Sequence, residues 1–168
     1  MKKVINFWFG AMVLALCVGF SSCSGDDDES AGSGGSGELY LDGNKLTVYD
    51  AGGFYLTATK YLSIAAYTEK ERSKMGRSGL SMDWVELDIN SLNVGDDLCK
   101  KGKIHSFFYN IDLYTGYSAH KNYDDISVIV KDINLKKNQI TLEFKDTKLW
   151  HYETDKYHTI SGKVTAKL

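Results

Sequence analysis

Apolar and polar residues alternate with a period of two along much of the chain after residue 38. In the clearest run, Phe107, Tyr109, Ile111 and Leu113 occupy alternate positions, with mostly polar residues between them. Successive side chains of a strand point to opposite faces of its sheet, so this run predicts an antiparallel strand with one buried face. The same pattern predicts three further buried rows, which are Ile126, Val128 and Val130; Ile140, Leu142 and Phe144; and Ile160, Val164 and Ala166.

Turn-forming residues separate these runs. The Asp-Gly-Asn sequence at 42–44 predicts a hairpin turn, and the Lys-Lys-Asn sequence at 136–138 predicts a second tight turn. We expect residues 50–53 to break the chain and residues 146–156 to form an open stretch. Gly162 falls in a buried row, where a glycine indicates a bend or a close approach of two backbones.

The remaining pattern fixes the fold class. Leu80, Met82 and Trp84 alternate in one phase, and the apolar residues from Val85 onward alternate in the opposite phase, which predicts a β-bulge near this point. No stretch shows a convincing helical face. About eight or nine short strands without helices predict an all-β protein, and we favour an antiparallel β-sandwich. A calycin-like closed β-barrel is the alternative.

The first 22 residues have the order of a secretory signal. Lys2 and Lys3 give a positive start, a mostly apolar run follows, and the small residues Ser21 and Ser22 come directly before Cys23. This order predicts an exported chain that is cut before Cys23. The alternatives are a plain signal peptide with an incidental cysteine, and a retained membrane helix. The apolar run is at or below the roughly 20 residues that a spanning helix needs.

The residues around the cut carry a resemblance. Phe20-Ser21-Ser22-Cys23 resembles a bacterial lipobox, with Phe20 in the place of the usual leucine, and the acidic stretch at 24–29 resembles the export tether of surface lipoproteins in Bacteroidetes-type bacteria. The resemblance implies that Cys23 is lipidated and that the chain is held in the outer membrane, exposed at the cell surface. The membrane is then its first partner. Each buried methylene contributes about 0.8 kcal/mol, so the several acyl chains carried by this family would anchor stably.

These observations predict three parts, which are a lipoprotein signal peptide at 1–22, the lipidated Cys23 with a flexible acidic Gly/Ser tether to residue 37, and a single β-domain at 38–168. The tether lacks apolar periodicity and cannot bury a core. After the predicted cut, 18 basic and 22 acidic residues remain, and the four excess acids lie at 26–29. The β-domain is therefore balanced in charge, which argues against nucleic acid as a partner.

The closing run, ITLEFKDTKLW followed by ISGKVTAKL, resembles the last hairpin of small, uncharacterised β-domain lipoproteins from the same bacterial group. No function follows from this resemblance.

The sequence gives no sign of catalysis. It lacks the spaced motifs of serine hydrolases, zinc peptidases and dithiol oxidoreductases. Cys99 is the one cysteine of the β-domain, and we expect an apolar filler rather than a reactive thiol. His151 and His158 flank one stretch and could meet across a hairpin, which would suit a metal, but we expect them to be exposed or singly hydrogen-bonded. We therefore predict a protein that is not an enzyme, with no catalytic residue, metal or cofactor.

Two groups of charged residues do not predict a functional site. Asp83 falls on the opposite face of its strand from Glu86 and Asp88, so these three residues do not form the facing carboxylate pair of a glycosidase. Residues 69–79 are rich in bases, and we expect a solvated connection there. The alternative is a binding loop for an acidic surface.

Five aromatic residues in the two longest polar stretches are our candidate ligand contacts, namely Tyr114, Tyr117, Tyr123, Trp150 and Tyr152. Tyrosine and tryptophan in loops offer rigid, amphipathic surface for stacking on sugars or for contacting proteins. The alternative is that these rings fold back over the ends of the sandwich. We predict a binding module for a glycan or a protein. A structural or accessory subunit of an envelope complex, recognised through a sheet edge or the basic loop, is the second hypothesis, and the oligomeric state is left open.

Overall fold

A computed structural model describes residues 34–70, 78–110, 116–118, 126–151 and 153–168. For residues 116–118 it describes the backbone alone. The chain divides into two compact units, Met1–Ser30 and Ala31–Leu168, and all the described residues belong to the second. The predicted signal peptide, the lipidation of Cys23 and most of the predicted tether thus lie outside the described residues.

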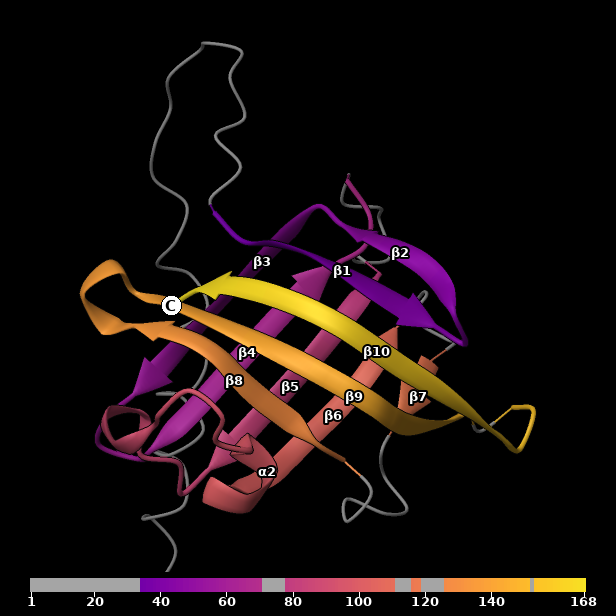
Figure 1. The fold of residues 1–168 in the computed structure, drawn as a ribbon. Helices are drawn as coiled ribbons and strands as arrows, with labels where there is room; N and C mark the ends of the chain where they lie inside the picture. Colours follow the sequence, from indigo (N-terminus) through magenta and orange to yellow (C-terminus); the bar gives the residue numbers. More distant parts are fainter. Residues whose placement is uncertain (1–33, 71–77, 111–115, 119–125, 152) are drawn as a thin grey trace, which may run out of the picture. The chain divides into compact units, whose positions relative to one another are not determined.

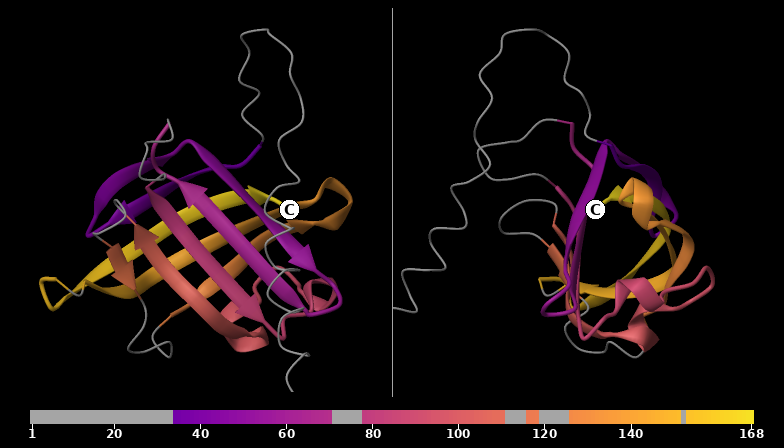
Figure 2. Two further views of the ribbon diagram at one scale, coloured as in Figure 1. Left: turned by 180° about the vertical axis from the view of Figure 1, so that it is seen from behind. Right: turned by 90° about the vertical axis from the view of Figure 1, so that its left-hand side faces the viewer.

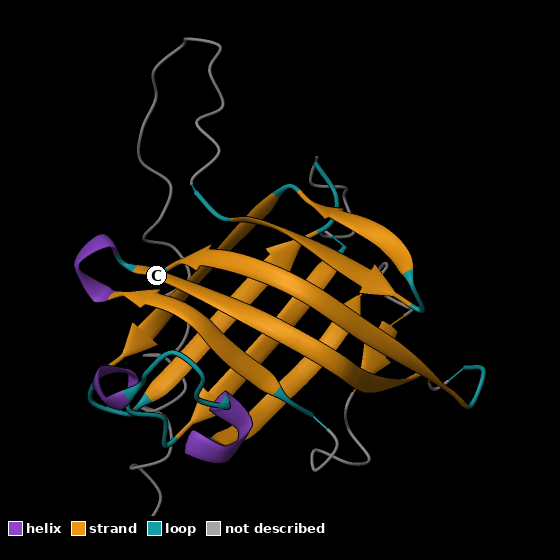
Figure 3. Ribbon diagram, viewed as in Figure 1, coloured by secondary structure: helices purple, strands orange, loops and turns teal. Residues whose placement is uncertain are grey.

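The described residues form ten strands and three short helical turns (Figure 3). The strands are β1 (Ser36–Leu41), β2 (Asn44–Val48), β3 (Asp50–Leu56), β4 (Tyr61–Tyr67), β5 (Gly79–Val85), β6 (Lys103–Asn110), β7 (Gly116–Ser118), β8 (Val128–Asn134), β9 (Gln139–His151) and β10 (Lys156–Lys167). The helical turns are η2 (Ile89–Ser91), α2 (Leu98–Lys101) and η4 (Leu135–Lys137). The all-β prediction is confirmed.

The strands lie in two layers that cross at a steep angle (Figure 1). One layer contains β3, β4, β5, β6 and β7, and the other contains β2, β1, β10, β9 and β8. Neighbours within a layer are antiparallel, as predicted for a sandwich. The layers also touch at two corners, through one parallel residue pair between β3 and β10 and two antiparallel pairs between β7 and β9. Such short corners do not close the layers into a barrel, so the calycin-like alternative is wrong.

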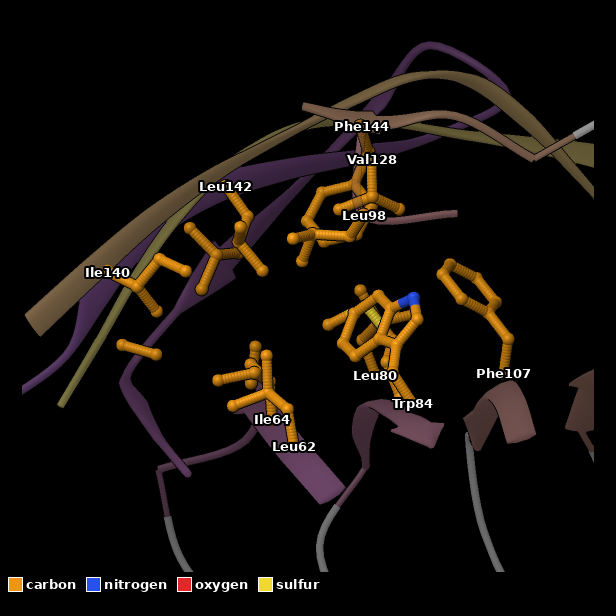
Figure 4. Packing of buried hydrophobic residues seen from close by; sticks show 14 of the residues in the cluster. Leu62, Ile64, Leu80, Trp84, Leu98, Phe107, Val128, Ile140, Leu142 and Phe144 are labelled. Carbon is orange, nitrogen blue, oxygen red and sulfur yellow. The ribbon is translucent and has the colours of Figure 1, made fainter. Parts of the chain in front are cut away.

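The core lies between the two layers, and the predicted period-two rows build it. In β4 the residues Leu62, Ile64 and Ala66 are fully buried, while their neighbours in sequence are only half-buried. Figure 4 shows residues of this layer facing those of the other layer across the interior. The buried residues of the second layer include the predicted rows Ile126, Val128 and Val130; Ile140, Leu142 and Phe144; and Ile160, Val164 and Ala166.

Two stretches that we predicted as interruptions are strands. Residues 50–53 begin β3, where Ala51 is fully buried and Gly53 lets the backbone lie close to β4. The stretch after residue 146 continues β9 as far as His151. Asp146 has a left-handed backbone with φ 43°, so the buried row shifts phase, from Phe144 to Thr147, and then continues. Because of this bulge, the alternation along the whole of β9 cannot be recognised in the sequence.

The phase change after Trp84 also has a different cause from the predicted bulge. The strand β5 ends at Val85, and Glu86 turns the chain with φ 57°. The next amide, of Leu87, donates to the carbonyl of Lys60 at 2.9 Å, which fixes Leu87 inward. The pairing of β5 with β6 does shift register, one residue earlier, between Asp83 and Trp84.

The two edges of the second layer differ. Beside β8, the amide of Val130 donates to the carbonyl of Asp96 and the amide of Gly95 donates to the carbonyl of Val130, both at 2.8 Å. The loop before α2 therefore covers this edge. At the other edge, β2 pairs along its length with β1 and, among the described strands, with no other. An edge of this kind offers backbone groups to another chain.

Gly162 confirms the predicted close backbone contact. Its φ is 125°, and a Cβ atom at this position would lie 2.2 Å from the carbonyl oxygen of Glu38. We expect Gly162→Ala to lower the free energy of unfolding by at least about 2 kcal/mol, because backbone strain and a backbone clash add together. Thermal unfolding of the full-length chain, followed by circular dichroism, measures the effect.

Gly43→Ala is the matched control, since Gly43 also has a positive φ, 79°, but has open space around it. Strain alone should cost this variant about 1 kcal/mol. Equal losses in the two variants would show that β1 and β10 do not approach as closely at Gly162 as the structure has it.

Candidate functional site

The β9–β10 hairpin carries an aromatic pair on its outer face, at the end where the turn joins the two strands. Trp150 in β9 lies directly opposite Tyr157 in β10. Directly opposed residues of an antiparallel pair have their side chains on the same face. Leu149 and His151, on either side of Trp150, are buried, so the indole lies on the outer face. Tyr157 is 58% exposed, and Trp150 is half-buried.

A hydrogen bond fixes the orientation of the tryptophan. The indole N–H of Trp150 donates to Oδ1 of Asp155 at 2.9 Å. Asp155 lies in the turn between the strands and has a left-handed backbone with φ 52°. A carboxylate accepts several hydrogen bonds, so Asp155 retains acceptor capacity after this bond. The hairpin end thus presents a fixed indole, an exposed phenol and a carboxylate close to one another around the β9–β10 turn.

Two histidines support the hairpin from its inner side. The rings of His151 and His158 are in edge-to-face contact, with 5.9 Å between their centroids. Nδ1 of His151 accepts the backbone N–H of Thr154 at 3.2 Å, and His158 contacts the carboxylate of Asp42 in the β1–β2 turn. The backbone N–H of Thr159 lowers the pKa of Asp42, and His158 lowers it further. The two histidines thus meet across the hairpin, which was the alternative for them, and the expectation of exposure is wrong for His151, which is buried.

Nδ1 of His151 already accepts the backbone N–H of Thr154, so this nitrogen is not available to a metal ion. Within the part of the chain that the structure describes, no group of three or more histidine, cysteine, aspartate or glutamate side chains gathers in a ligating arrangement. His158 and Asp42 instead tie the β1–β2 turn to β10.

The structure brings two of the five predicted site residues onto neighbouring strands. Tyr117 pairs with His151 in backbone register, and Ser118 pairs with Trp150. The other three, Tyr114, Tyr123 and Tyr152, lie outside the described residues. Sequence reasoning missed Tyr157. Its alternation with the buried row of β10 is visible in the sequence, but its place opposite Trp150 depends on a register that the sequence does not reveal.

An open groove of about 630 Å³ lies on the outer side of β1, β9 and β10, around the bulge at Lys145 and Asp146. Two of the carboxylates that line it are in salt bridges, Glu38 with Lys45 and Glu143 with Lys131. The groove therefore lacks the facing pair of free carboxylates that glycoside hydrolysis uses. Its chemistry is that of a mixed-charge surface.

A second surface lies on the opposite layer, on the outer face of β3, β4, β5 and β6 (Figure 2, left). Phe54, Ser63, Asp83 and Ser106 stand directly opposite one another on the four strands and form a row across it. Phe54 is 49% exposed and its ring lies 5.8 Å from that of Tyr61. An outer sheet face with this much apolar area differs from the usual polar one.

Cys99 is an inert thiol in this structure. Burial raises the pKa of its thiol to about 12, and the neighbouring Asp97 carboxylate adds to the effect. We expect iodoacetamide at pH 8 to modify Cys99 at least about a hundredfold more slowly in the folded chain than in urea, where its pKa is near 8.5. Mass spectrometry of the peptide that contains Cys99 separates it from the other cysteines. Equal rates in the two states would contradict the burial of this side chain.

Comparisons with models of protein families, with curated proteins and with solved structures return no match. Among the described residues, no helix has the length and apolar character to cross a membrane. Fold and surface together define the class at a coarse level, as an all-β, sandwich-like protein with an aromatic pair exposed at one hairpin end.

Proposed function

We propose that this protein is a lipid-anchored lipoprotein of the bacterial outer membrane and cell surface, and that its β-domain is a noncatalytic module that binds a glycan. The observation that most strongly supports glycan binding is the pairing of half-buried Trp150 with exposed Tyr157, next to Asp155, which accepts a hydrogen bond from Trp150. The predicted ligand class was glycan or protein, and we commit to glycan because of the chemistry of this hairpin end.

The chemistry suits a sugar ring. The C–H groups of a pyranose pack on the face of an indole or phenol, and the two rings offer large apolar area at a small cost in side-chain entropy. A carboxylate beside the rings accepts hydrogen bonds from sugar hydroxyls and so sets the orientation of the ring. Trp150 and Asp155 are already fixed by their mutual hydrogen bond, which lowers the cost of ordering on binding.

A glycan array tests the binding. The full-length chain in detergent is compared with the double variant Trp150→Ala, Tyr157→Ala and with a control, Phe54→Ala, Leu56→Ala, which removes two exposed apolar side chains from the opposite layer. We expect saturable binding by the wild type and by the control, and loss of that signal in the double variant. Equal signals in all three proteins, or no signal on any glycan, would contradict the proposal.

The proposed anchor rests on the lipobox-like residues before Cys23. A tether of residues 24–35, before β1 begins at Ser36, has an r.m.s. span of about 20 Å if it is a flexible Gly/Ser-rich coil, enough to hold the hairpin end clear of the lipid headgroups. We expect Cys23→Ala to move the protein from the membrane fraction to the soluble fraction, because stable anchoring needs acyl chains. A variant that still sediments fully with membranes would end this part of the proposal, and Cys99→Ala is the matched control.

The uncovered edge of β2 favours the second candidate function, an accessory subunit of an envelope complex. A strand of another protein can add to such an edge through backbone hydrogen bonds. Thr47→Pro would block this addition, since proline lacks the N–H group. If Thr47→Pro abolishes co-purification of an envelope partner while glycan binding persists, the protein has this role as well.

A further inference from the structure

The second surface, on the outer face of β3, β4, β5 and β6, is separate from the hairpin end and has a chemistry of its own. Asp83 stands near its centre, flanked by Ser63 and Ser106 on the neighbouring strands. The hydroxyl of Ser106 donates to Oδ2 of Asp83. Burial and the neighbouring Asp83 carboxylate raise the pKa of the Tyr61 phenol. Among the described residues, the hydroxyl groups of Ser106 and Tyr61 are thus the hydrogen-bonding neighbours of this carboxylate.

Two of the described cations next to this face are paired with other acids. Lys103 makes a salt bridge with Glu86 at 2.8 Å, and Lys60 lies 3.9 Å from Asp88. Asp83 makes no salt bridge with any residue that the structure describes. Hydrogen bonds from neutral groups orient a carboxylate but leave its negative charge in place.

Aromatic rings stand on both sides of the carboxylate. Phe54 and Tyr61 pack together on the β3 and β4 side, and Phe108 lies on β6, opposite Ser81. The positions between them are small, since Ala65 pairs with Ser81 across β4 and β5. A carboxylate among small side chains is therefore bordered by aromatic residues on β3, β4 and β6. The face of an aromatic ring carries negative electrostatic potential, so rings and carboxylate attract the same kind of group.

We propose that this face binds the cationic side chain of an arginine or lysine from a protein partner, with Asp83 as the counter-ion and Phe54 and Phe108 as the flanking rings. Charge complementarity decides for a cation, because a neutral sugar would leave the charge of Asp83 uncompensated. Arginine fits best, since its planar guanidinium stacks on rings and donates two parallel hydrogen bonds to one carboxylate. This inference does not depend on the glycan site.

Fluorine NMR tests it on the lipid-anchored chain in nanodiscs of neutral lipid, labelled with 4-fluorophenylalanine at Phe54, Phe107, Phe108 and Phe144, the phenylalanines that follow Cys23. The Phe54 and Phe108 signals are assigned with Phe54→Tyr and Phe108→Tyr. N-acetyl-arginine methylamide is the probe, and N-acetyl-citrulline methylamide, which has the same shape without the charge, is its control. We expect saturable shifts of both signals with the arginine probe and none with citrulline. Asp83→Asn should weaken the apparent affinity roughly tenfold or more.

Asp132→Asn is the matched variant, because Asp132 is an exposed carboxylate on β8, in the other layer. The affinity of this variant for the arginine probe should equal that of the wild type. The citrulline comparison uses the wild type, so it remains informative if Asp83→Asn does not fold. Equal shifts with arginine and citrulline, a larger response to methyl glucoside, or an undiminished response in Asp83→Asn would each overturn the proposal. The glycan-site double variant should respond to arginine like the wild type.

Discussion

Replacing Trp84 by alanine is expected to lower the free energy of unfolding by about 3–5 kcal/mol, the usual cost of removing a fully buried tryptophan. Trp84 is completely buried, and in Figure 4 its indole extends into the interior toward the side where Leu98 and Phe144 lie. Its removal leaves a cavity that side chains of both layers border. The melting temperature should fall by about 10–20 °C, as measured by circular dichroism of the full-length chain.

Trp150→Ala is the matched control for this variant. It removes the same side chain from a half-buried position on the outer face, and we expect it to cost about 1 kcal/mol, mostly through the hydrogen bond to Asp155. If the two variants lost equal stability, Trp84 would not be at the centre of the core. Trp84→Phe should cost less than Trp84→Ala, since a phenyl ring refills part of the cavity and the indole N–H gives up only a weak contact with the sulfur of Cys99.

Asp97→Ala is expected to lower the free energy of unfolding by about 3 kcal/mol, because one carboxylate holds three groups in place. Oδ1 of Asp97 accepts the backbone N–H of Cys99 at 3.0 Å, which caps α2, and that of Val128 at 3.2 Å. Oδ2 accepts the hydroxyl of Ser127 at 3.0 Å. The side chain therefore joins α2 to the start of β8, and alanine would leave all three donors without this partner.

The control for Asp97 is Asp132→Ala. Asp132 is exposed on β8, and its replacement should change the free energy of unfolding by no more than about 0.5 kcal/mol. Asp97→Asn should fall between the two, since an amide keeps one acceptor oxygen but loses the charge. A loss below about 1 kcal/mol in Asp97→Ala would show that the loop before α2 stays in place without these bonds.

The sequence predicted the parts of the fold whose period-two alternation is unbroken. The rows around Val128, Leu142 and Val164 are buried as expected, because a strand with one face in the core must alternate. The alternation failed at Asp146, where a single left-handed residue shifts the phase of β9. Aspartate adopts a positive φ more readily than most residues, but few aspartates do so, and the sequence does not tell which ones.

The choice between sandwich and barrel was beyond the sequence for a different reason. It depends on how far two layers pair at their corners, and those pairings, at Gly52 with Lys167 and at Tyr117 with His151, join residues far apart in the chain. Alternation reports which face of a strand is buried and does not report its neighbour. The strand order β2-β1-β10-β3 was hidden for the same reason.

The site was predicted in part. Trp150 could be predicted because a large aromatic residue in a polar stretch is a candidate for ligand contact. Its partners Tyr157 and Asp155 could not, because they depend on the register of β9 against β10 and on the conformation of the turn. Asp83 was considered only for its position relative to Glu86 and Asp88, because its serine and aromatic neighbours come from three other strands.

The most direct test of glycan binding at the hairpin end is the affinity of the strongest array glycan for the Trp150→Ala single variant, measured by biolayer interferometry on the full-length chain. The proposed contact predicts that binding weakens about tenfold or more relative to the wild type, because the stacking surface of the indole is lost. Phe54→Ala should bind as the wild type does. An affinity that is unchanged in Trp150→Ala would contradict the proposed site.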